Sequence, residues 1–342
     1  MSPVEQLPEE ETDMYHAMVA REVDGKITLA PEKIDAAELG TGGVLIRVQY
    51  SSVNYKDGLA ITPGGGAVSS YPLVPGIDLA GEVVESDDER FRPGDPVLAH
   101  GYGIGISQHG GFAEHARVPA DWVVPLRYLT PRQAVGIGTA GFTAALSVRA
   151  LQAGGVEPTS GPILVTGASG GVGSISVDIL VRLGYDVVAS TGKPEAADLL
   201  ARLGAEVVGR VPEDATELKR PLGREQWAGA IDCVGGQTLA WVLSTVQHGG
   251  VVAASGLTGG PGLPTTVLPF ILRGVTLVGI DSVQVDIATR RRLWHDLETD
   301  LGPEYLDDLV REVAVRDVQG TIGTVLRGEA TGRTVVRVAD GF

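Results

Sequence analysis

Four neighbouring residues near the start of the chain could carry out acid–base chemistry. The stretch "VNYKDG" places the amide of Asn54, the phenol of Tyr55, the amine of Lys56 and the carboxylate of Asp57 side by side. A tyrosine phenol ordinarily stays protonated at neutral pH, so Tyr55 could donate a proton to a substrate. Lys56 could bind a thioester or phosphate oxygen, and Asp57 could orient Lys56. The alternative interpretation is a polar turn whose tyrosine packs on a cofactor and does no chemistry.

A second candidate motif is the glycine-rich loop "VTGASGGVG", which follows a strand-like run and precedes a helix-like run. This context favours a dinucleotide fingerprint, in which glycines let the backbone approach a pyrophosphate and let the helix pack on the strand. Aligned with G-x-G-x-x-G, Ala168 replaces the first glycine. The glycines could also serve only to make the turn. The residues expected around the pyrophosphate are Ser169, Gly170, Gly171, Val172 and Gly173.

The residues after the next strand-like run favour NADPH over NADH. In NAD-binding proteins, an Asp or Glu roughly 20 residues after the loop accepts the ribose 2′-hydroxyl. This chain instead reads "VVASTGK", with Thr191, Gly192 and Lys193 and no carboxylate before Glu195. A cation beside hydroxyl groups suits a 2′-phosphate, and Arg210 in "EVVGR" is a candidate second phosphate ligand. The alternative for either cation is a solvated surface charge.

The order of strand-like and helix-like runs predicts an α/β protein with two domains. Residues 15–135 contain short β-like runs between Gly, Pro and Asp turns, which is typical of a barrel. Over residues 136–284 strands alternate with helices, which predicts a doubly wound parallel sheet of six strands. Residues 285–342 end in the strand-like run "GRTVVRVAD", which we expect to return to the first domain. We expect the acidic residues 1–14 to form a flexible tail.

Composition limits the location and the partners. A length of 342 residues suits two domains of ordinary size. The net charge of −16 disfavours binding to nucleic acids or anionic membranes, which depends on clustered Lys and Arg. Cys233 is the only cysteine, which excludes an intrachain disulfide and a cysteine-rich zinc site. The N-terminus lacks the basic and apolar regions of a signal peptide, so we expect a cytoplasmic protein with a small-molecule substrate.

Seven longer strings show a resemblance to a known superfamily. They are "SSVNYKDGLAI", "YPLVPGIDLAGEV", "GGFAEHARV", "GTAGFTAALSV", "VTGASGGVGS", "LPFILRGVTLVGIDSV" and "GRTVVRV". The chain resembles the medium-chain dehydrogenase/reductase superfamily over everything after the acidic tail, and within it the quinone oxidoreductase-like acrylyl-CoA reductase branch. "NYKD" and "PFILRGV…GIDSV" are specific to that branch. The resemblance implies a GroES-like β-barrel domain followed by a Rossmann NADP-binding domain.

The resemblance also implies that the catalytic zinc of other superfamily members is missing. Zinc members use a Cys, a His in a Gly-His-Glu string and a second Cys. Here the first region reads Asn54 to Asp57 and the second reads Gly76-Ile77-Asp78. Without a Lewis acid, alcohol oxidation is not expected. Reduction of an activated C=C bond needs only a hydride, a polarised carbonyl and a proton.

Further roles carry over by position. The resemblance places Tyr55 beside the nicotinamide and Asn54 against the nicotinamide ribose or the substrate. The other implied cofactor contacts are Leu257, Ile271, Ser282 and Arg333. Leu257 and Ile271 could equally be core residues. Where the branch usually has an Asn ahead of "QGRT", this chain reads "GEATGR" before its last strand-like run.

A run of three arginines, residues 290–292, could bind the phosphates of coenzyme A, with a solvated helix face as the alternative. The leading hypothesis is NADPH-dependent reduction of a short 2-enoyl-CoA, most simply acryloyl-CoA to propanoyl-CoA. A second hypothesis keeps the cofactor and replaces the substrate with a quinone or a free enone. A third is a cofactor-binding protein without activity. Relatives are mostly homodimers joined across the "VTLVGIDS" edge strand, so the resemblance also implies a homodimer.

Overall fold

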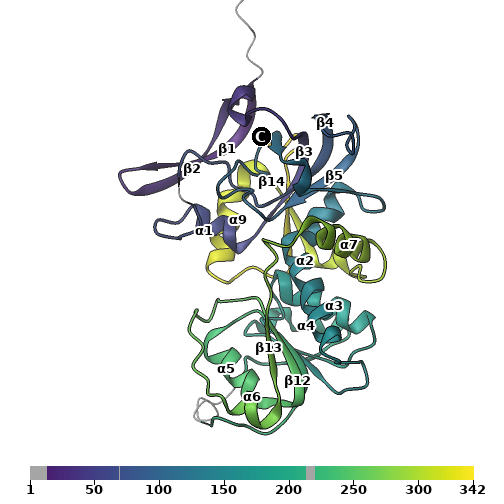
Figure 1. Ribbon diagram of the computed structural model, residues 1–342. Coiled ribbons are helices and arrows are strands. Elements are labelled where there is room, and N and C mark those ends of the chain that lie inside the picture. Colours follow the sequence, from purple (N-terminus) through teal and green to yellow (C-terminus); the bar gives the residue numbers. More distant parts are fainter. Residues whose placement is uncertain (1–13, 69, 213–219) are drawn as a thin grey trace, which may run out of the picture.

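The computed structural model describes residues 14–68, 70–212 and 220–342, arranged as two domains (Figure 1). Met14 begins the first strand, so the predicted acidic tail is shorter than residues 1–14 and otherwise lies outside the described residues. The barrel-like domain lies at the top of Figure 1 and the domain with the parallel sheet lies below it. The C-terminal segment, in yellow, lies beside the barrel.

The upper domain is built from antiparallel strands. Its strands are β1 (Met14–Val23), β2 (Lys26–Asp35), β3 (Val44–Val53), β4 (Asp78–Ser86), β5 (Pro96–His100), β6 (His115–Val118) and β7 (Val123–Pro125). A short helix, α1 (Tyr55–Ala60), follows β3, and 3-10 turns span Ala36–Leu39 and Ala120–Trp122. The larger sheet has the order β14-β15-β3-β4-β5-β7, with β6 also paired to β3. Strand β3 therefore lies at the centre of this domain and places α1 at one of its ends.

The lower domain is the doubly wound sheet that the sequence predicts. Its elements are β8 (Ile163–Thr166), α3 (Gly171–Arg182), β9 (Val187–Ser190), α4 (Ala197–Arg202), β10 (Glu206–Val208), β11 (Trp227–Asp232), α5 (Gly236–Thr245), β12 (Val246–Ala254), α6 (Leu268–Arg273) and β13 (Thr276–Gly279). All six strands are parallel, in the order β10-β9-β8-β11-β12-β13. The order reverses next to β8, at the carboxyl edge where such sheets bind ligands.

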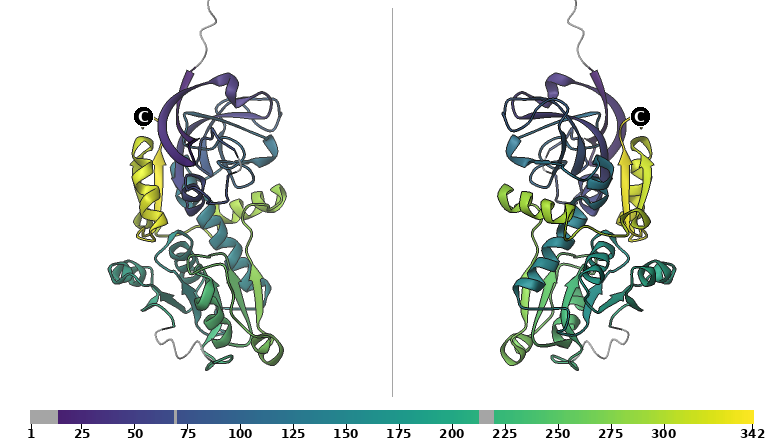
Figure 2. Two further views of the ribbon diagram at one scale, coloured as in Figure 1. Left: turned by 90° about the vertical axis from the view of Figure 1, so that its left-hand side faces the viewer. Right: turned by 90° about the vertical axis from the view of Figure 1, so that its right-hand side faces the viewer.

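One long helix, α2 (Pro131–Ala153), joins the two domains (Figure 2). Thr130 caps its first turn and Pro131 occupies the first helical position, where a missing N–H costs nothing. Among the described residues it is the one helix long and apolar enough to cross a membrane, but 78% of its apolar window is buried in the protein. A single hydrophobic cluster runs along it, from Leu98 of β5 through Ile137 to Ile163 of β8.

The C-terminal part of the chain returns to the upper domain. It contains α7 (Ile287–Glu298), α8 (Leu306–Leu309), β14 (Val310–Ala314), α9 (Val318–Leu326) and β15 (Arg333–Arg337), with a 3-10 turn at Val315–Asp317. Strand β15 pairs antiparallel with β3, with Val335 opposite Ser52. Helix α9 packs against α1 so closely that a Cβ on Gly58 would lie 2.5 Å from the Leu326 side chain. The end of the chain therefore supports the helix that begins at Tyr55.

Helix α2 is interrupted at Gly138, which has a φ of +52°. A Cβ at this position would lie 2.4 Å from Asp78 Oδ2 and 2.6 Å from Arg333 Nη2. Glycine is therefore required both for the left-handed backbone and for the approach of two charged side chains.

We expect Gly138→Ala to lower the free energy of unfolding by more than about 2 kcal/mol, because the new methyl group must displace a buried charged side chain. Gly155→Ala is the matched control, since Gly155 also has a positive φ (+84°) but open space around it. The control is expected to cost about 1 kcal/mol from the backbone alone. Denaturant unfolding of both variants measures the difference, and equal losses would contradict the role of the two charged neighbours.

Candidate functional site

Asp57 fixes the start of α1 to the loop before β4. Its Oδ2 accepts the backbone N–H of Asn54 at 2.7 Å, and its Oδ1 accepts those of Gly76 and Ile77 at 3.1 and 2.9 Å. The carboxylate is completely buried, and its three partners are backbone amides. The prediction that Asp57 orients Lys56 is therefore wrong. Burial, with a smaller effect of the Asp78 charge, raises the pKa of Asp57 to about 7 against the opposing hydrogen bonds.

Tyr55 and Lys56 remain available to a ligand. Tyr55 occupies the first position of α1 and is 37% exposed, and Lys56 is partly exposed beside it. Neither the phenol nor the amine makes a hydrogen bond or ion pair with the part of the chain that the structure describes. The two side chains suited to donating a proton and to binding an anion are thus the two that the structure leaves free.

A buried ion pair, Asp78 with Arg333, lies directly behind this cluster. Arg333 Nη2 lies 3.4 Å from Asp78 Oδ2, and their side chains are 3% and 0% exposed. Asp78 also accepts hydrogen bonds from the Ser52 hydroxyl at 2.5 Å and from the Thr139 hydroxyl at 2.5 Å. Burial lowers the pKa of Arg333, and the charges of Asp78 and Asp57 oppose this shift. One carboxylate thus joins β3, β4, α2 and β15.

The side-chain amide of Asn54 is hydrogen-bonded to both members of this ion pair. Its Nδ2 donates to Asp78 Oδ2 at 2.8 Å and its Oδ1 accepts from Arg333 Nη1 at 3.0 Å. We therefore assign Asn54 a positioning role in place of the predicted contact with the ribose or substrate. The predicted cofactor contact of Arg333 stays a prediction, and its remaining donors bind Ser52 and the backbone carbonyls of Val53, Val135 and Gly136.

The glycine-rich loop connects β8 to α3 and lies next to Arg333. Gly170 is the N-cap, and a Cβ on Gly173 would lie 2.4 Å from the Gly167 carbonyl oxygen, so the helix can follow the strand only with glycine there. A Cβ on Gly171 would lie 3.2 Å from Arg333 Cδ. The amides of Gly171, Val172 and Gly173 in the first turn of this helix have no acceptor within it. These open amides and the close approach fit a dinucleotide pyrophosphate.

The loop after β9 has the features expected of a 2′-phosphate site. Thr191 is buried and donates to the Ser169 hydroxyl at 2.9 Å, which ties this loop to the glycine-rich loop. A Cβ on Gly192 would lie 2.6 Å from Arg210 Nη2, so the guanidinium of Arg210 lies across this glycine. Lys193 is next in the chain, and burial lowers its pKa against the opposing charges of two glutamates. Arg210 therefore lies over the glycine that precedes Lys193, and the 2′-phosphate site stays a prediction.

The loop carrying Lys193 also contacts the C-terminal segment. The Lys193 ammonium donates to the carbonyl of Ala330, and the Gly332 N–H donates to the Ser169 carbonyl at 2.9 Å. The "GEATGR" stretch, where the chain departs from the acrylyl-CoA reductase pattern, is therefore tied to the cofactor domain by backbone atoms.

The remaining predicted cofactor contacts separate into two groups. Ser282 is half-buried and follows the carboxyl end of β13, and Leu257 follows β12 at the same edge and is 54% exposed. Ile271 is 69% exposed on α6, which leads into the opposite, amino end of β13. The exposed fractions exclude the core alternative for Leu257 and Ile271. The prediction that Ile271 contacts the cofactor stays a prediction, and the glycine-rich loop lies at the other edge of the sheet.

The three arginines of α7 do not form a phosphate site. Arg290 is completely buried, and Arg291 donates to the Val123 carbonyl at 2.9 Å. The prediction of coenzyme A binding is wrong for these two residues. Arg292 is exposed and, within the part of the chain that the structure describes, bonds only to Thr289 of its own helix, which fits a solvated helix face.

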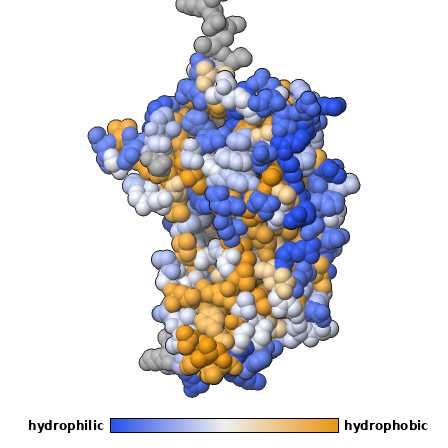
Figure 3. All heavy atoms as spheres, in the orientation of Figure 1, coloured by the Kyte–Doolittle hydropathy of each residue, from blue (hydrophilic) through white to orange (hydrophobic). Residues whose placement is uncertain are grey.

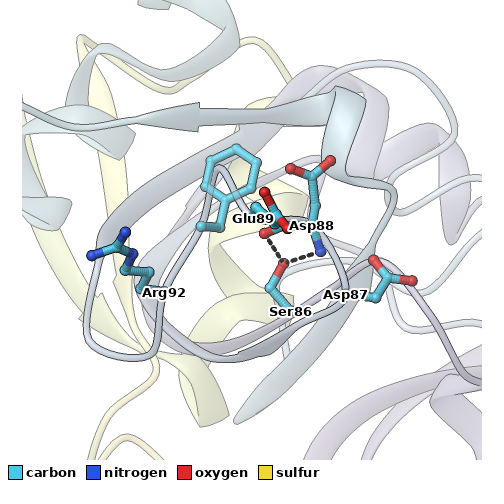
Figure 4. Close-up of a pocket in the computed structure, with 6 residues that line it drawn as sticks. Ser86, Asp87, Asp88, Glu89 and Arg92 are labelled. Atoms are coloured by element: carbon cyan, nitrogen blue, oxygen red, sulfur yellow. Dashed lines mark hydrogen bonds between the residues drawn. The ribbon is translucent and has the colours of Figure 1, made fainter.

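An open depression lies in the loop after β4, at Ser86, Asp87, Asp88, Glu89, Phe91 and Arg92 (Figure 4). Ser86 bonds the backbone of Asp88 there. The strand runs from Asp78 to Ser86, so this depression is about 26 Å from the buried ion pair at 3.3 Å per residue. Its acidic side chains do not suit an anionic substrate. No cluster of three or more His, Cys, Asp or Glu residues that could hold a metal occurs among the described residues.

Sequence analysis missed the buried residues that hydrogen-bond around the Asp78–Arg333 pair, next to Tyr55. Asp78 was considered only as the replacement for a zinc-site residue, while Ser52, His100 and Thr139 were not singled out. The paired serines before "VNYKD" and the hydroxyl after the glycine in "GTAGF" were the available signals. Neither signal indicates a partner, because the residues meet only after β3, β4 and α2 have packed together.

Two family matches cover most of the chain. Residues 40–128 match the alcohol dehydrogenase GroES-like domain family, and residues 171–298 match the zinc-binding dehydrogenase family. Acrylyl-CoA reductase AcuI of Ruegeria pomeroyi is 49% identical over 95% of this chain and 99% of its own length. The putative quinone oxidoreductase YhfP of Bacillus subtilis is 48% identical over 95% of this chain and 99% of its own length.

Solved structures of two oxidoreductase-type proteins are also similar to this chain over nearly its full length. The yhdH oxidoreductase of Salmonella enterica in complex with NADP has a TM-score of 0.90 and 43% identity, covering 94% of this chain and 99% of that chain. The Bacillus subtilis protein yhfP with NAD bound has a TM-score of 0.92 and 48% identity, covering 95% of this chain and 100% of that chain.

The raised pKa of Asp57 predicts a pH dependence of stability. The pKa is about 7 in the folded protein and 3.8 is its ordinary value, so the folded state holds the proton more tightly. The contribution of this group to stability is full below about pH 4 and is lost as the pH rises to about 7. Relative to Asp57→Asn, which does not titrate, we expect the unfolding free energy of the unmodified chain to fall by up to about 4 kcal/mol over that range. Urea unfolding at several pH values measures this, and a constant difference would contradict the raised pKa.

Proposed function

Because the chain belongs to the medium-chain dehydrogenase/reductase superfamily, we propose that it is an NADPH-dependent reductase of the C=C bond of a short 2-enoyl-CoA, with acryloyl-CoA reduced to propanoyl-CoA. One observation carries this proposal. Arg333 donates to Asn54, which precedes Tyr55, and its stem occupies the space that a side chain on Gly171, in the first turn of α3, would need. The phenol and the predicted pyrophosphate site are therefore held by the same buried side chain. The name of the Ruegeria pomeroyi relative supports the substrate class.

The residues of the chain have distinct tasks in this proposal. Bound NADPH supplies the hydride. The amides of Gly171, Val172 and Gly173 bind the pyrophosphate, and Lys193 with Arg210 binds the 2′-phosphate. Tyr55 donates a proton to the substrate after hydride addition at the β-carbon, and solvent restores the phenol. Lys56 binds an anionic oxygen of the thioester or of coenzyme A.

We further propose a zinc-independent reaction in the cytoplasm. The positions that would hold the catalytic zinc carry Asn54-Tyr55-Lys56-Asp57 and Gly76-Ile77-Asp78. The Asp78 carboxylate is already bound by Arg333, Ser52 and Thr139, so it has no free oxygen with which to bind zinc. A single cysteine suits a reducing compartment.

A second candidate function is the reduction of a quinone or a free enone, supported by the name of the Bacillus subtilis relative. The exposed Tyr55 and the predicted cofactor site would serve either acceptor. A protein that binds NADPH without activity is the third candidate, and the uncommitted side chains of Tyr55 and Lys56 speak against it.

The first prediction of this proposal concerns cofactor preference. Lys193→Ala combined with Arg210→Ala is expected to lower the ratio of kcat/KM for NADPH to that for NADH by about 100-fold, since two charge-assisted hydrogen bonds to the 2′-phosphate are lost. Arg202→Ala, an exposed arginine on α4, is the control and should leave the ratio unchanged. An unchanged ratio in the double variant would contradict the assigned phosphate site.

The second prediction concerns the substrate. NADPH oxidation with acryloyl-CoA, measured at 340 nm beside crotonyl-CoA and a simple quinone, is expected to reach a kcat/KM of about 10⁴ M⁻¹s⁻¹ or above. Tyr55→Phe is expected to lower kcat by about 10²-fold or more, because the proton donor is lost. Quinone reduction without thioester reduction would favour the second candidate function, and a Tyr55→Phe enzyme that keeps more than half its kcat would remove Tyr55 from the mechanism.

We also propose a homodimer. An apolar surface covers the lower domain around α5, α6 and β13 in Figure 3. The exposed apolar side chains at the start of α6 and on it are Val267, Ile271 and Leu272. Strand β13 forms an open edge of the parallel sheet beside it, and an edge strand can pair with a second copy.

The homodimer predicts that Ile271→Asp sediments as a monomer where the unmodified chain sediments as a dimer. A charge at the interface would be desolvated on association. Val23→Asp, at an exposed apolar residue of the other domain, is the control and should remain dimeric. A monomeric unmodified chain at micromolar concentration would contradict the proposal.

A further inference from the structure

Arg290 is a buried cation without a carboxylate partner among the groups it contacts. It lies on α7 and is 0% exposed, with its guanidinium 4.5 Å from the ring centroid of Tyr102 and 5.0 Å from that of Phe142. Burial lowers its pKa. A buried charge is costly unless its hydrogen bonds are satisfied, so the partners of this guanidinium indicate what the residue is for.

Two of those partners are backbone carbonyls in the segment that contains Ser282, a predicted cofactor contact. Arg290 Nη2 donates to the carbonyl of Ser282 at 3.2 Å and to that of Val283 at 3.0 Å. This segment leaves the carboxyl end of β13 and passes to the upper domain. The Tyr102 N–H also donates to the Val283 carbonyl at 3.2 Å. The path of the chain after Ser282 is therefore fixed by the Arg290 side chain of α7 and the Tyr102 backbone of the upper domain.

Arg290 also contacts two side chains: the Tyr102 hydroxyl, which accepts from Nε at 3.3 Å, and His100, whose protonation the geometry determines. Trp294 Nε1 donates to His100 Nε2 at 2.8 Å. Arg290 Nη1 lies near both ring nitrogens, 2.8 Å from Nε2 and 3.1 Å from Nδ1. Because tryptophan only donates hydrogen bonds, Nε2 is the acceptor and the ring proton is on Nδ1. Burial and the charge of Arg290 lower the pKa of His100 well below its ordinary range, which keeps the ring neutral.

The hydrogen bonds then run in one direction to the site. His100 Nδ1 lies 3.2 Å from the Thr139 hydroxyl, which donates in turn to Asp78 Oδ1 at 2.5 Å. Asp78 Oδ2 accepts from the Asn54 amide at 2.8 Å. A continuous buried network thus leads from the Ser282 carbonyl to the residue that precedes Tyr55.

We propose that Arg290, His100 and Thr139 are positioning residues for hydride transfer, because one hydrogen-bonded network joins the backbone at Ser282, a predicted cofactor contact, to Asn54, which precedes the proposed proton donor Tyr55. The inference rests on the proposed function for the nicotinamide, but the contacts do not depend on which substrate is reduced. A misplacement of about 1 Å between reacting groups can cost about 100-fold in rate. The network accordingly controls kcat and has little effect on the affinity for NADPH, whose phosphates bind elsewhere.

The test interrupts the network at its smallest member. Thr139→Val removes the hydroxyl and keeps a side chain of similar shape, and Thr139→Ser keeps the hydroxyl. We expect Thr139→Val to lower kcat by about tenfold or more with the KM for NADPH changed less than about threefold. Thr139→Ser is expected to retain at least half of kcat. Arg290→Lys keeps a cation without the planar fork and is expected to lower kcat similarly, while Arg292→Met, two residues along the same helix, should leave kcat unchanged.

A second readout does not depend on activity. The His100 signal is identified in ¹⁵N spectra of the imidazoles as the one that disappears in His100→Gln. We expect this ring to carry its proton on Nδ1 and not to titrate between about pH 5 and 9. A ring with the other tautomer, or one that titrates there, would overturn the network. A Thr139→Val enzyme with unchanged kcat, or equal losses in the valine and serine variants, would overturn the positioning role.

The two readouts separate this inference from the proposed function. If the unmodified chain reduces none of the thioesters, the proposed function fails and the fluorescence of bound NADPH replaces kcat. Thr139→Val is then expected to lower that fluorescence by half or more, and Thr139→Ser is not. Should Arg290→Lys fail to fold, the Thr139 pair still decides.

Discussion

The ion pair between Asp78 and Arg333 is the constraint on which the rest of the structure depends. Both side chains are buried, and taking two charges out of water costs several kcal/mol unless the remaining hydrogen-bonding groups are satisfied. Here they are satisfied by side chains and carbonyls of β3, α2 and the residues around Asn54. The pair is stable only when four distant parts of the chain have come together, which makes it a condition for one arrangement of the two domains.

Several local features follow from this pair. Helix α2 bends at Gly138 because any side chain there would occupy the space of Asp78 and Arg333. The bend turns the Thr139 N–H and hydroxyl toward the carboxylate. Strand β15 must return from the far end of the chain because it carries Arg333. The glycine at position 171 leaves room for the same arginine beside the first turn of α3. Tyr55 and Lys56 stay exposed because their neighbours on both sides, Asn54 and Asp57, are the ones used for structure.

The sequence predicts local features better than it predicts side-chain partners. Alternating strands and helices were sufficient for the six-stranded parallel sheet, and the glycine-rich loop was recognisable because its role depends on residues close in sequence. The approach of Arg210 to Gly192, beside Lys193, could also be predicted from the sequence, since adjacent parallel strands end at the same edge of the sheet. The partners of Asp57 and Arg333 could not be predicted. The sequence of a charged residue is the same whether its side chain faces a ligand or binds a buried backbone amide 20 residues away. The position of Ile271 at the amino end of β13 could not be predicted either, since it depends on the path of the loop before α6.

The most direct test of this account is a double-mutant cycle on the buried pair, with unfolding free energy and kcat measured for Asp78→Asn, Arg333→Met and both together. Each single variant leaves a buried charge or its partners unsatisfied and is predicted to cost about 3–5 kcal/mol, with the double variant costing much less than the sum. The kcat is predicted to fall in all three, since each loses the anchor of Asn54. Small, additive losses of stability with kcat retained would contradict the claim that this pair holds the two domains and the candidate site together.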